Sequence, residues 1–211
     1  MKKIILCLLV SSLFITSCKK DTKQPEETTQ EAKTPTYSVD ASTTEINWTA
    51  YKTTAKTPVK GIFTSLNIDK PIQSDSKQGA FANLEFSIPV SSFFSKNDIR
   101  DNKIKKLFFG LMKETTLISG HFSDINGNEE EGSLSLNLKM NGETIAVPMK
   151  YTISDNKVDI NGTITNLMDW KMDAAFESLH KACELLHTGE DGISRTWEDV
   201  AINATAVLKR N

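Results

Sequence analysis

The most constraining feature of the sequence is a strict alternation of apolar and polar residues over positions 132–153. In its first half the apolar residues occupy every second position: Leu134, Leu136, Leu138 and Met140. Because successive side chains of a strand point to opposite faces, these four share one face. Asn141-Gly142 follows, the dipeptide that most readily takes positive φ at both centres of a tight turn, and the alternation then resumes. The stretch predicts a half-buried antiparallel hairpin.

Other parts of the chain repeat this extended pattern. We expect strands at residues 37–40, 45–52, 59–68, 81–90, 115–122, 158–164 and 197–208. Two stretches have helical spacing instead: 92–109, a short helix or irregular crossover, and 172–187, a helix that Gly189 can end. Some eight short strands with hairpin connections predict a mainly β fold, an antiparallel barrel or sandwich with one or two short helices. A barrel of about eight strands has room inside for side chains or one small ligand.

The N-terminus has the pattern of an export signal. Lys2-Lys3 supplies positive charge, and residues 4–15 form an apolar core too short for an ordinary transmembrane helix. Thr16-Ser17-Cys18 is typical of a bacterial lipobox, in which small residues precede a cysteine whose thiol is lipidated. We predict a lipoprotein signal peptide over residues 1–17 and a lipid anchor, with acyl chains such as palmitate, on Cys18. The alternative is an ordinary secretory signal with an incidental cysteine.

The segment after Cys18 is rich in Thr, Glu, Lys, Gln and Pro and has no apolar periodicity. Such a segment cannot bury enough apolar surface to offset the entropy of ordering, so residues 18–36 are expected to be a disordered tether. The folded domain then covers residues 37–211. This organisation predicts a membrane-anchored lipoprotein of the bacterial envelope, in the outer membrane, on its periplasmic or surface side.

Composition and motifs exclude several classes of function. The formal net charge of −2 gives no indication of nucleic acid as a partner. The three cysteines, Cys7, Cys18 and Cys183, do not form a disulfide framework. The sequence shows no Ser-His-Asp arrangement, no glycine-rich phosphate loop and no Cys-x-x-Cys pair. We therefore expect neither catalysis nor a cofactor.

Two stretches could be read as metal sites. His180, Cys183 and His187 fall near one face of the expected helix, at a spacing that could serve zinc or copper. The same positions overlap the apolar stripe of that helix, where a cysteine is usually a small buried hydrophobe. Residues 124–131 resemble a calcium loop, but the glycine and the final glutamate are out of place. Packing and an exposed turn explain both stretches better, and no metal site is predicted.

Taken in order, the strands resemble the YceI-like family of bacterial envelope proteins. The resemblance covers nearly all of residues 37–208. The matching pieces are Tyr37-Ser-Val-Asp40, Ile46-Asn-Trp48, Val59-Lys-Gly61-Ile-Phe63, Phe86-Ser-Ile-Pro-Val-Ser-Ser92, Asn97-Asp98-Ile-Arg-Asp101, and residues 134–148 around Asn141-Gly142.

This resemblance implies a lipocalin-like antiparallel barrel with a long apolar channel. Family members hold polyisoprenoids, isoprenoid quinones or fatty-acid derivatives there without catalysing a reaction. The candidate ligand-binding residues are apolar positions of the expected strands: Trp48, Phe63, Leu84, Phe86, Ile88, Leu134, Leu136 and Leu138. Two hypotheses follow: a lipid-anchored carrier or store, and an envelope structural or interaction module whose barrel has a solid core. A homodimer stays open under both.

The sequence departs from the family pattern in two places. The family usually has an aspartate and a Tyr-Pro pair before its central Phe strand, whereas residues 108–116 contain no Tyr-Pro. Residues 172–192, with the expected helix, look like an elaboration. Both departures could alter the mouth of the channel, so the resemblance leaves the identity of the ligand open.

Overall fold

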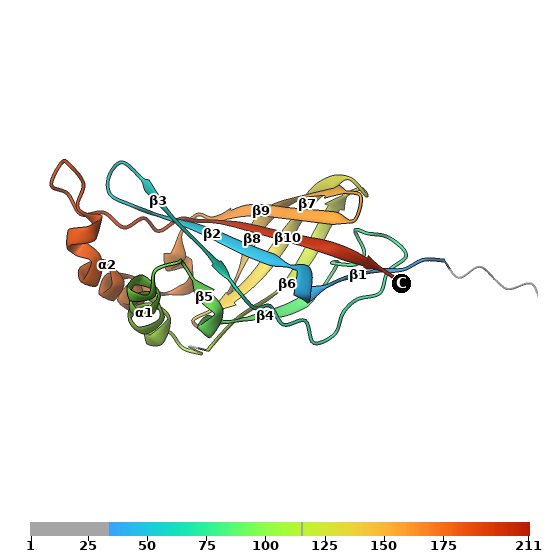
Figure 1. Cartoon of the computed structure of the whole chain (residues 1–211), viewed down its shortest axis with the longest axis horizontal. Helices are drawn as coiled ribbons and strands as arrows, with labels where there is room; N and C mark the ends of the chain where they lie inside the picture. Colours follow the sequence, from blue (N-terminus) through green and yellow to red (C-terminus); the bar gives the residue numbers. More distant parts are fainter. Residues whose placement is uncertain (1–33, 115) are drawn as a thin grey trace, which may run out of the picture. The chain divides into compact units, whose positions relative to one another are not determined.

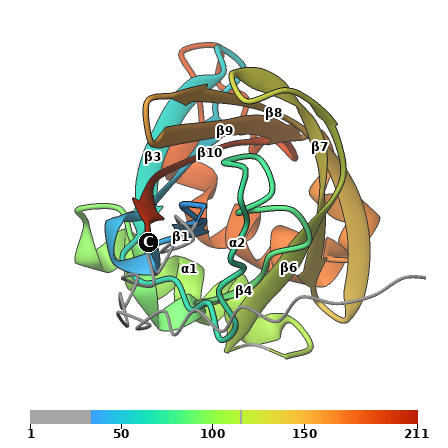
Figure 2. The same ribbon diagram turned by 90° about the vertical axis from the view of Figure 1, so that its right-hand side faces the viewer.

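Within the described residues, 34–114 and 116–211, ten antiparallel strands form one sheet that curls into a barrel (Figures 1 and 2). The strands are β1 (Tyr37–Val39), β2 (Glu45–Lys52), β3 (Thr57–Phe63), β4 (Glu85–Pro89), β5 (Phe93–Phe94), β6 (Leu117–Gly127), β7 (Glu131–Met140), β8 (Glu143–Ser154), β9 (Lys157–Ile164) and β10 (Val200–Arg210). The helices are α1 (Asp98–Leu107) and α2 (Asp173–His187), with short 3-10 turns η1 (Ala41–Thr43), η2 (Val90–Ser92), η3 (Phe109–Leu111) and η4 (Leu167–Trp170). The predicted signal peptide, Cys18 and most of the predicted tether lie outside the described residues.

The strands are hydrogen-bonded in the order β4-β6-β7-β8-β9-β10-β2-β3-β5, and β1 pairs with β10. The two ends of this order are brought together by the chain between β3 and β4. There Asn67 and Ser87 exchange backbone hydrogen bonds of 2.8 and 3.0 Å, and Thr64 N donates to Ser92 O at 3.0 Å. These bonds satisfy backbone groups that an open sheet would leave unpaired. The barrel is nearly closed as a result (Figure 2).

The structure confirms the predicted mainly β, lipocalin-like antiparallel barrel, with ten strands in place of about eight. The expected helix at 172–187 is α2, and the ambiguous stretch 92–109 contains α1. No helix in this described part is long and apolar enough to cross a membrane.

Two expected strands are shorter than predicted. The stretch 59–68 leaves the sheet after Phe63, and the stretch 81–90 enters it only at Glu85. Before Glu85 the chain turns, with Asn83 at φ 58°, a backbone conformation that a strand cannot accommodate. Phe81 and Leu84 are nevertheless buried, at 1% and 3% exposed, so their apolar character predicted burial correctly and strand structure wrongly.

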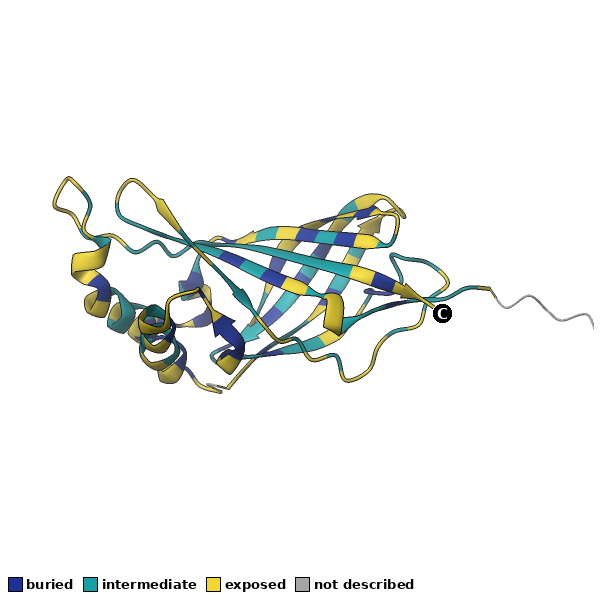
Figure 3. Cartoon of the chain, viewed as in Figure 1, coloured by how far each residue is buried: buried dark blue, intermediate teal, exposed yellow. Residues whose placement is uncertain are grey.

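The hairpin at 132–153 forms as predicted, from β7 and β8. Leu134, Leu136, Leu138 and Met140 are buried, while the residues between them are more exposed (Figure 3). Asn141 and Gly142 make the turn with φ of 50° and 79°. Met140 pairs with Glu143 across that turn, which fixes the register of all ten paired positions.

Asn141 also ties this turn to the chain segments around it. Its side-chain oxygen accepts a hydrogen bond from Lys113 N at 2.8 Å. Its side-chain nitrogen donates to the carbonyl oxygens of Trp170 and Lys171, both at 2.9 Å. One residue therefore joins the hairpin to the segment after η3 and to the end of η4.

Substitutions of Asn141 should separate its role in the turn conformation from its role in the three hydrogen bonds. N141G keeps the freedom to adopt positive φ but loses three hydrogen bonds, each worth about 0.5–1.5 kcal/mol, so we expect a loss of about 2 kcal/mol or more. N141A should lose about 1 kcal/mol beyond N141G, because alanine resists the left-handed conformation. Urea unfolding would measure both variants. Equal stability of N141G and the wild type would contradict the anchoring role.

Candidate functional site

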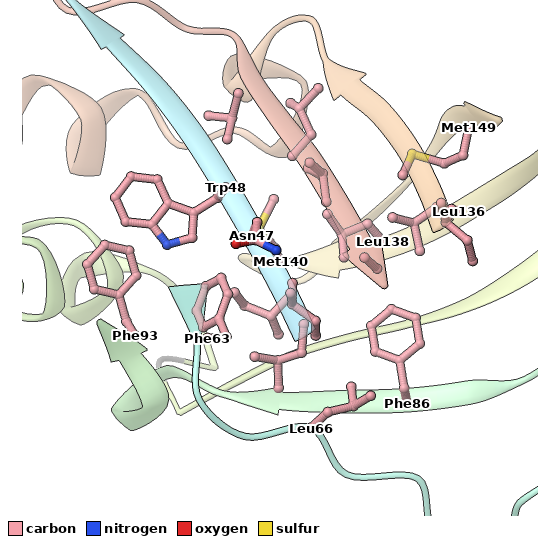
Figure 4. A pocket seen from close by; sticks show the side chains of 18 of the residues that line it. Asn47, Trp48, Phe63, Leu66, Phe86, Phe93, Leu136, Leu138, Met140 and Met149 are labelled. Carbon is pink, nitrogen blue, oxygen red and sulfur yellow. The ribbon is translucent and has the colours of Figure 1, made fainter. Parts of the chain in front are cut away.

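The barrel encloses a cavity of about 240 Å³ (Figure 4). Every strand and both helices contribute residues to its wall, and among the described residues that line it none carries a charge. The wall consists almost entirely of aliphatic and aromatic side chains. Such a surface offers water few hydrogen bonds, so it favours an apolar occupant over solvent.

The structure brings together seven of the eight residues predicted to contact a ligand. Trp48, Phe63, Leu84, Phe86, Ile88, Leu136 and Leu138 all lie in the cavity wall. The eighth, Leu134, is 3% exposed and belongs to the buried core, but it does not belong to the residues that line the cavity. Whether these residues contact a ligand stays a prediction.

The predicted set left out large parts of the wall. Ile160 of β9 and Ile202 and Ala204 of β10 line the cavity, and the same alternation that marked Leu136 and Leu138 was present in their strands. Phe176 and Leu179 of α2 also line it. The sequence marked them as part of an apolar helix stripe, but only the docked position of α2 shows that this stripe faces the cavity.

Trp48 is held in the wall by an aromatic neighbour and by a glycine. Its ring stacks on Phe93, with centroids 4.8 Å apart and planes 16° from parallel. Gly61 lies opposite Trp48 in the β2–β3 register. A Cβ at position 61 would lie 2.2 Å from Trp48 Cζ2 and 2.6 Å from Phe94 O, so only glycine leaves room for the indole.

Helices α1 and α2 cover one end of the barrel (Figure 1). Ile104 of α1 reaches the cavity beside the α2 residues. Lys103 Nζ of α1 donates to Ala182 O at 2.8 Å, and Lys52 Nζ of β2 donates to Leu186 O at 3.0 Å. These two lysines connect α2 to α1 and to the barrel. The helices therefore form part of the cavity wall instead of an independent layer.

The histidines of α2 contact the segment that leads into β10. His180 Nδ1 and His187 Nδ1 lie 2.9 and 2.6 Å from the same atom, Thr196 Oγ1, and Thr196 lines the cavity. Cys183 is buried, and desolvation raises the pKa of its thiol. In the part of the chain that the structure describes, no group of three or more His, Cys, Asp or Glu side chains could hold a metal ion. The contacts that the structure gives these three side chains are the two histidine–Thr196 hydrogen bonds and the burial of Cys183.

The segment that resembles a calcium loop, residues 124–131, consists of the end of β6, a turn at residues 128–130 and the first residue of β7. Asn128 Oδ1 accepts hydrogen bonds from the backbone nitrogens of Glu130 and Glu131 at 2.8 and 3.0 Å. The Glu129 carboxylate accepts one from Lys77 N at 2.8 Å. The polar side chains of this turn are therefore used to order the turn and to join it to the loop before β4.

Burial lowers the pKa of His187 to about 4, and the nearby positive charges of Lys52, His180 and Lys103 add to this effect. His187 therefore stays neutral in the folded protein at pH values at which it is protonated in the unfolded chain, where its pKa is about 6.5. Stability should be unaffected above that pH and should fall as the pH drops from about 6.5 toward 4. Because His187 is half-exposed, we expect a loss of roughly 1 kcal/mol between pH 7.5 and 5.

Urea unfolding at the two pH values would measure this loss, and H187Q should flatten the difference. Most carboxylates stay ionised over this range, so they contribute little to it. An unchanged pH dependence in H187Q would show that the effect arises elsewhere.

Comparisons with known proteins give a consistent result. The sequence profile described as "YceI-like domain" matches residues 37–207. A polyisoprenoid binding domain from Saccharophagus degradans, implicated in plant cell wall breakdown, is 14% identical, with a TM-score of 0.56 over 83% of this chain and 98% of that one. Burkholderia cenocepacia BcnA is 15% identical, with a TM-score of 0.51 over 81% and 99%.

A third solved structure, the YCEI protein of Campylobacter jejuni, is 18% identical, with a TM-score of 0.52 over 72% of this chain and 85% of that one. No curated protein sequence matches the chain. At these identities the solved structures establish a shared fold.

Proposed function

The chain belongs to the YceI-like family, and from this premise we propose that its barrel binds a long apolar molecule as a non-catalytic carrier or store. The candidate classes are polyisoprenoids, isoprenoid quinones and fatty-acid derivatives. The observation that carries the proposal is the uncharged cavity of about 240 Å³ inside the barrel. The printed description of the S. degradans relative as a polyisoprenoid binding domain supports it. The alternative, an interaction module with a solid core, predicts no such cavity.

The cavity wall is suited to binding a ligand through buried apolar surface instead of through polar contacts. Burying apolar surface stabilises a complex by roughly 25 cal/mol per Å², or about 0.8 kcal/mol for each CH₂ group. A chain of ten or more carbons could therefore bind without an ion pair. The cavity is smaller than the roughly 300–1,000 Å³ usual for ligand sites, so a long ligand must be slender or must displace aromatic side chains of the wall.

We predict that protein purified from its native bacterium carries a stoichiometric apolar ligand, detectable by mass spectrometry of an organic extract. A204F should abolish or strongly reduce this ligand, because Ala204 lines the cavity and a phenyl ring there would occupy the space. A201F is the matched control. Ala201 lies on the same strand, three residues away, at a position of opposite parity on the outer face, so its ring should leave ligand content unchanged.

Wild-type protein without ligand, in a state that circular dichroism shows to be folded, would contradict the proposal. Loss of ligand from A201F as well as A204F would show that general destabilisation, not filling of the cavity, removes it.

We also propose that Cys18 anchors the protein to a membrane of the cell envelope, in the outer membrane. This rests on the sequence Thr16-Ser17-Cys18 after the short apolar core at residues 4–15. Several acyl chains together would make the attachment stable, since one chain gives only marginal binding. The barrel would then act close to the lipid phase that holds its ligand.

Metabolic labelling with palmitate tests the anchor. Wild-type protein should incorporate label and sediment with membranes, whereas C18S should take up no label and appear in the soluble fraction. C7S is the control, because Cys7 lies in the predicted signal peptide and should be removed with it. Label retained by C18S would exclude Cys18 as the attachment site.

A further inference from the structure

One polar group in the cavity wall has no hydrogen-bond partner. Among the buried side-chain nitrogen and oxygen atoms of the described residues, Trp48 Nε1 alone lacks one. An indole nitrogen is a donor only, so it needs an acceptor oxygen. Trp48 is 8% exposed, which places its N–H out of reach of bulk water.

The other two tryptophans show that this chain normally satisfies the indole N–H. Trp170 Nε1 donates to Leu138 O at 2.9 Å, and Trp197 Nε1 donates to Thr53 O at 2.8 Å. Trp197 also lines the cavity, so a place in the wall does not prevent pairing with the backbone. The lack of a hydrogen-bond partner is therefore specific to Trp48.

The position of this indole is fixed by its surroundings. Gly61 makes room for the ring, and Phe93 stacks on one face of it. In Figure 4 the indole nitrogen of Trp48 lies on the ring edge turned toward Phe93 and Phe63. Trp48 thus lies in a wall that is almost entirely apolar, and no described acceptor lies within hydrogen-bond distance of its Nε1.

We propose that the ligand carries an uncharged hydrogen-bond acceptor, such as a carbonyl oxygen, that Trp48 Nε1 binds. This inference rests on the proposed function and narrows it from any apolar chain to one with a polar oxygen near Trp48. A carboxylate fits less well, because the wall has no charged side chain to pair with it and burying an unpaired charge is strongly unfavourable. A pure hydrocarbon would leave the indole unpaired.

The geometry also defines how the oxygen arrives. A hydrogen bond from the indole requires an N···O distance of about 2.7–3.2 Å. The nitrogen atom has less than 1 Å² exposed, so the incoming oxygen must displace an apolar neighbour in the ring's vicinity. Phe93 covers one face of the ring, and the N–H lies in the plane of the ring, so the oxygen must approach the nitrogen edge.

Paired ligands that differ by one oxygen test the inference. Purified, delipidated protein would be loaded from detergent micelles with tridecane or 2-tridecanone and passed over gel filtration. Retained ligand would then be measured by mass spectrometry of an organic extract. For the wild type we expect the ketone to be preferred about 3- to 10-fold, the value of one net hydrogen bond.

The variants separate Trp48 from the rest of the wall. W48F removes the unpaired N–H donor. The ratio of retained 2-tridecanone to retained tridecane should therefore fall to the value for a cavity without a free donor. W197F also removes an indole from the wall, but one whose N–H is already used, so the ratio should remain as in the wild type even if total retention falls. The same ratio in W48F and the wild type would overturn the inference.

Nuclear magnetic resonance of ¹⁵N-labelled wild-type protein gives an answer that does not depend on a variant folding. Of the three indole N–H signals, one should move downfield with 2-tridecanone and stay in place with tridecane. Retention of both ligands with no such shift would overturn this inference and leave the proposed function intact. Failure to retain either ligand would overturn both.

Discussion

The structure depends on two requirements that must be met together. Every strand must bury one of its two faces, and every backbone N–H and C=O group must have a hydrogen-bond partner. Closing the sheet meets both demands at once, because closure removes the unpaired edges and turns the apolar faces toward a common interior. The bonds of Asn67 and Thr64 to the chain around β4 complete this closure. The side chains do not fill the interior of a barrel with this many strands, and a cavity of about 240 Å³ remains.

Local contacts that closure of the sheet does not require shape the cavity. Helix α2 is tied to the barrel by Lys52 and Thr196 and supplies part of the cavity wall. Gly61 and Phe93 hold Trp48 in a single position. The barrel provides an apolar cavity, and these local contacts decide its shape and the few polar groups in its wall.

The composition of the cavity wall agrees with the proposed role of a carrier. Affinity for a long apolar molecule grows with buried area and needs no charged group, which agrees with a wall made of aliphatic and aromatic side chains. Selectivity must then come from a small number of polar groups. The unpaired indole of Trp48 is the group that we propose for this role.

The sequence by itself determined most of the strands, the turn at Asn141-Gly142, helix α2 and seven residues of the cavity wall, because alternation and turn chemistry are local properties. It did not determine where the strands at 59–68 and 81–90 end and begin, or the short β5. It could not show that Leu134 packs in the core while Leu136 reaches the cavity, since both lie on the same face of β7. Nor could it separate the three tryptophans, of which two find a carbonyl oxygen and one does not. Those differences depend on which segments meet across the barrel, and only the tertiary structure decides that.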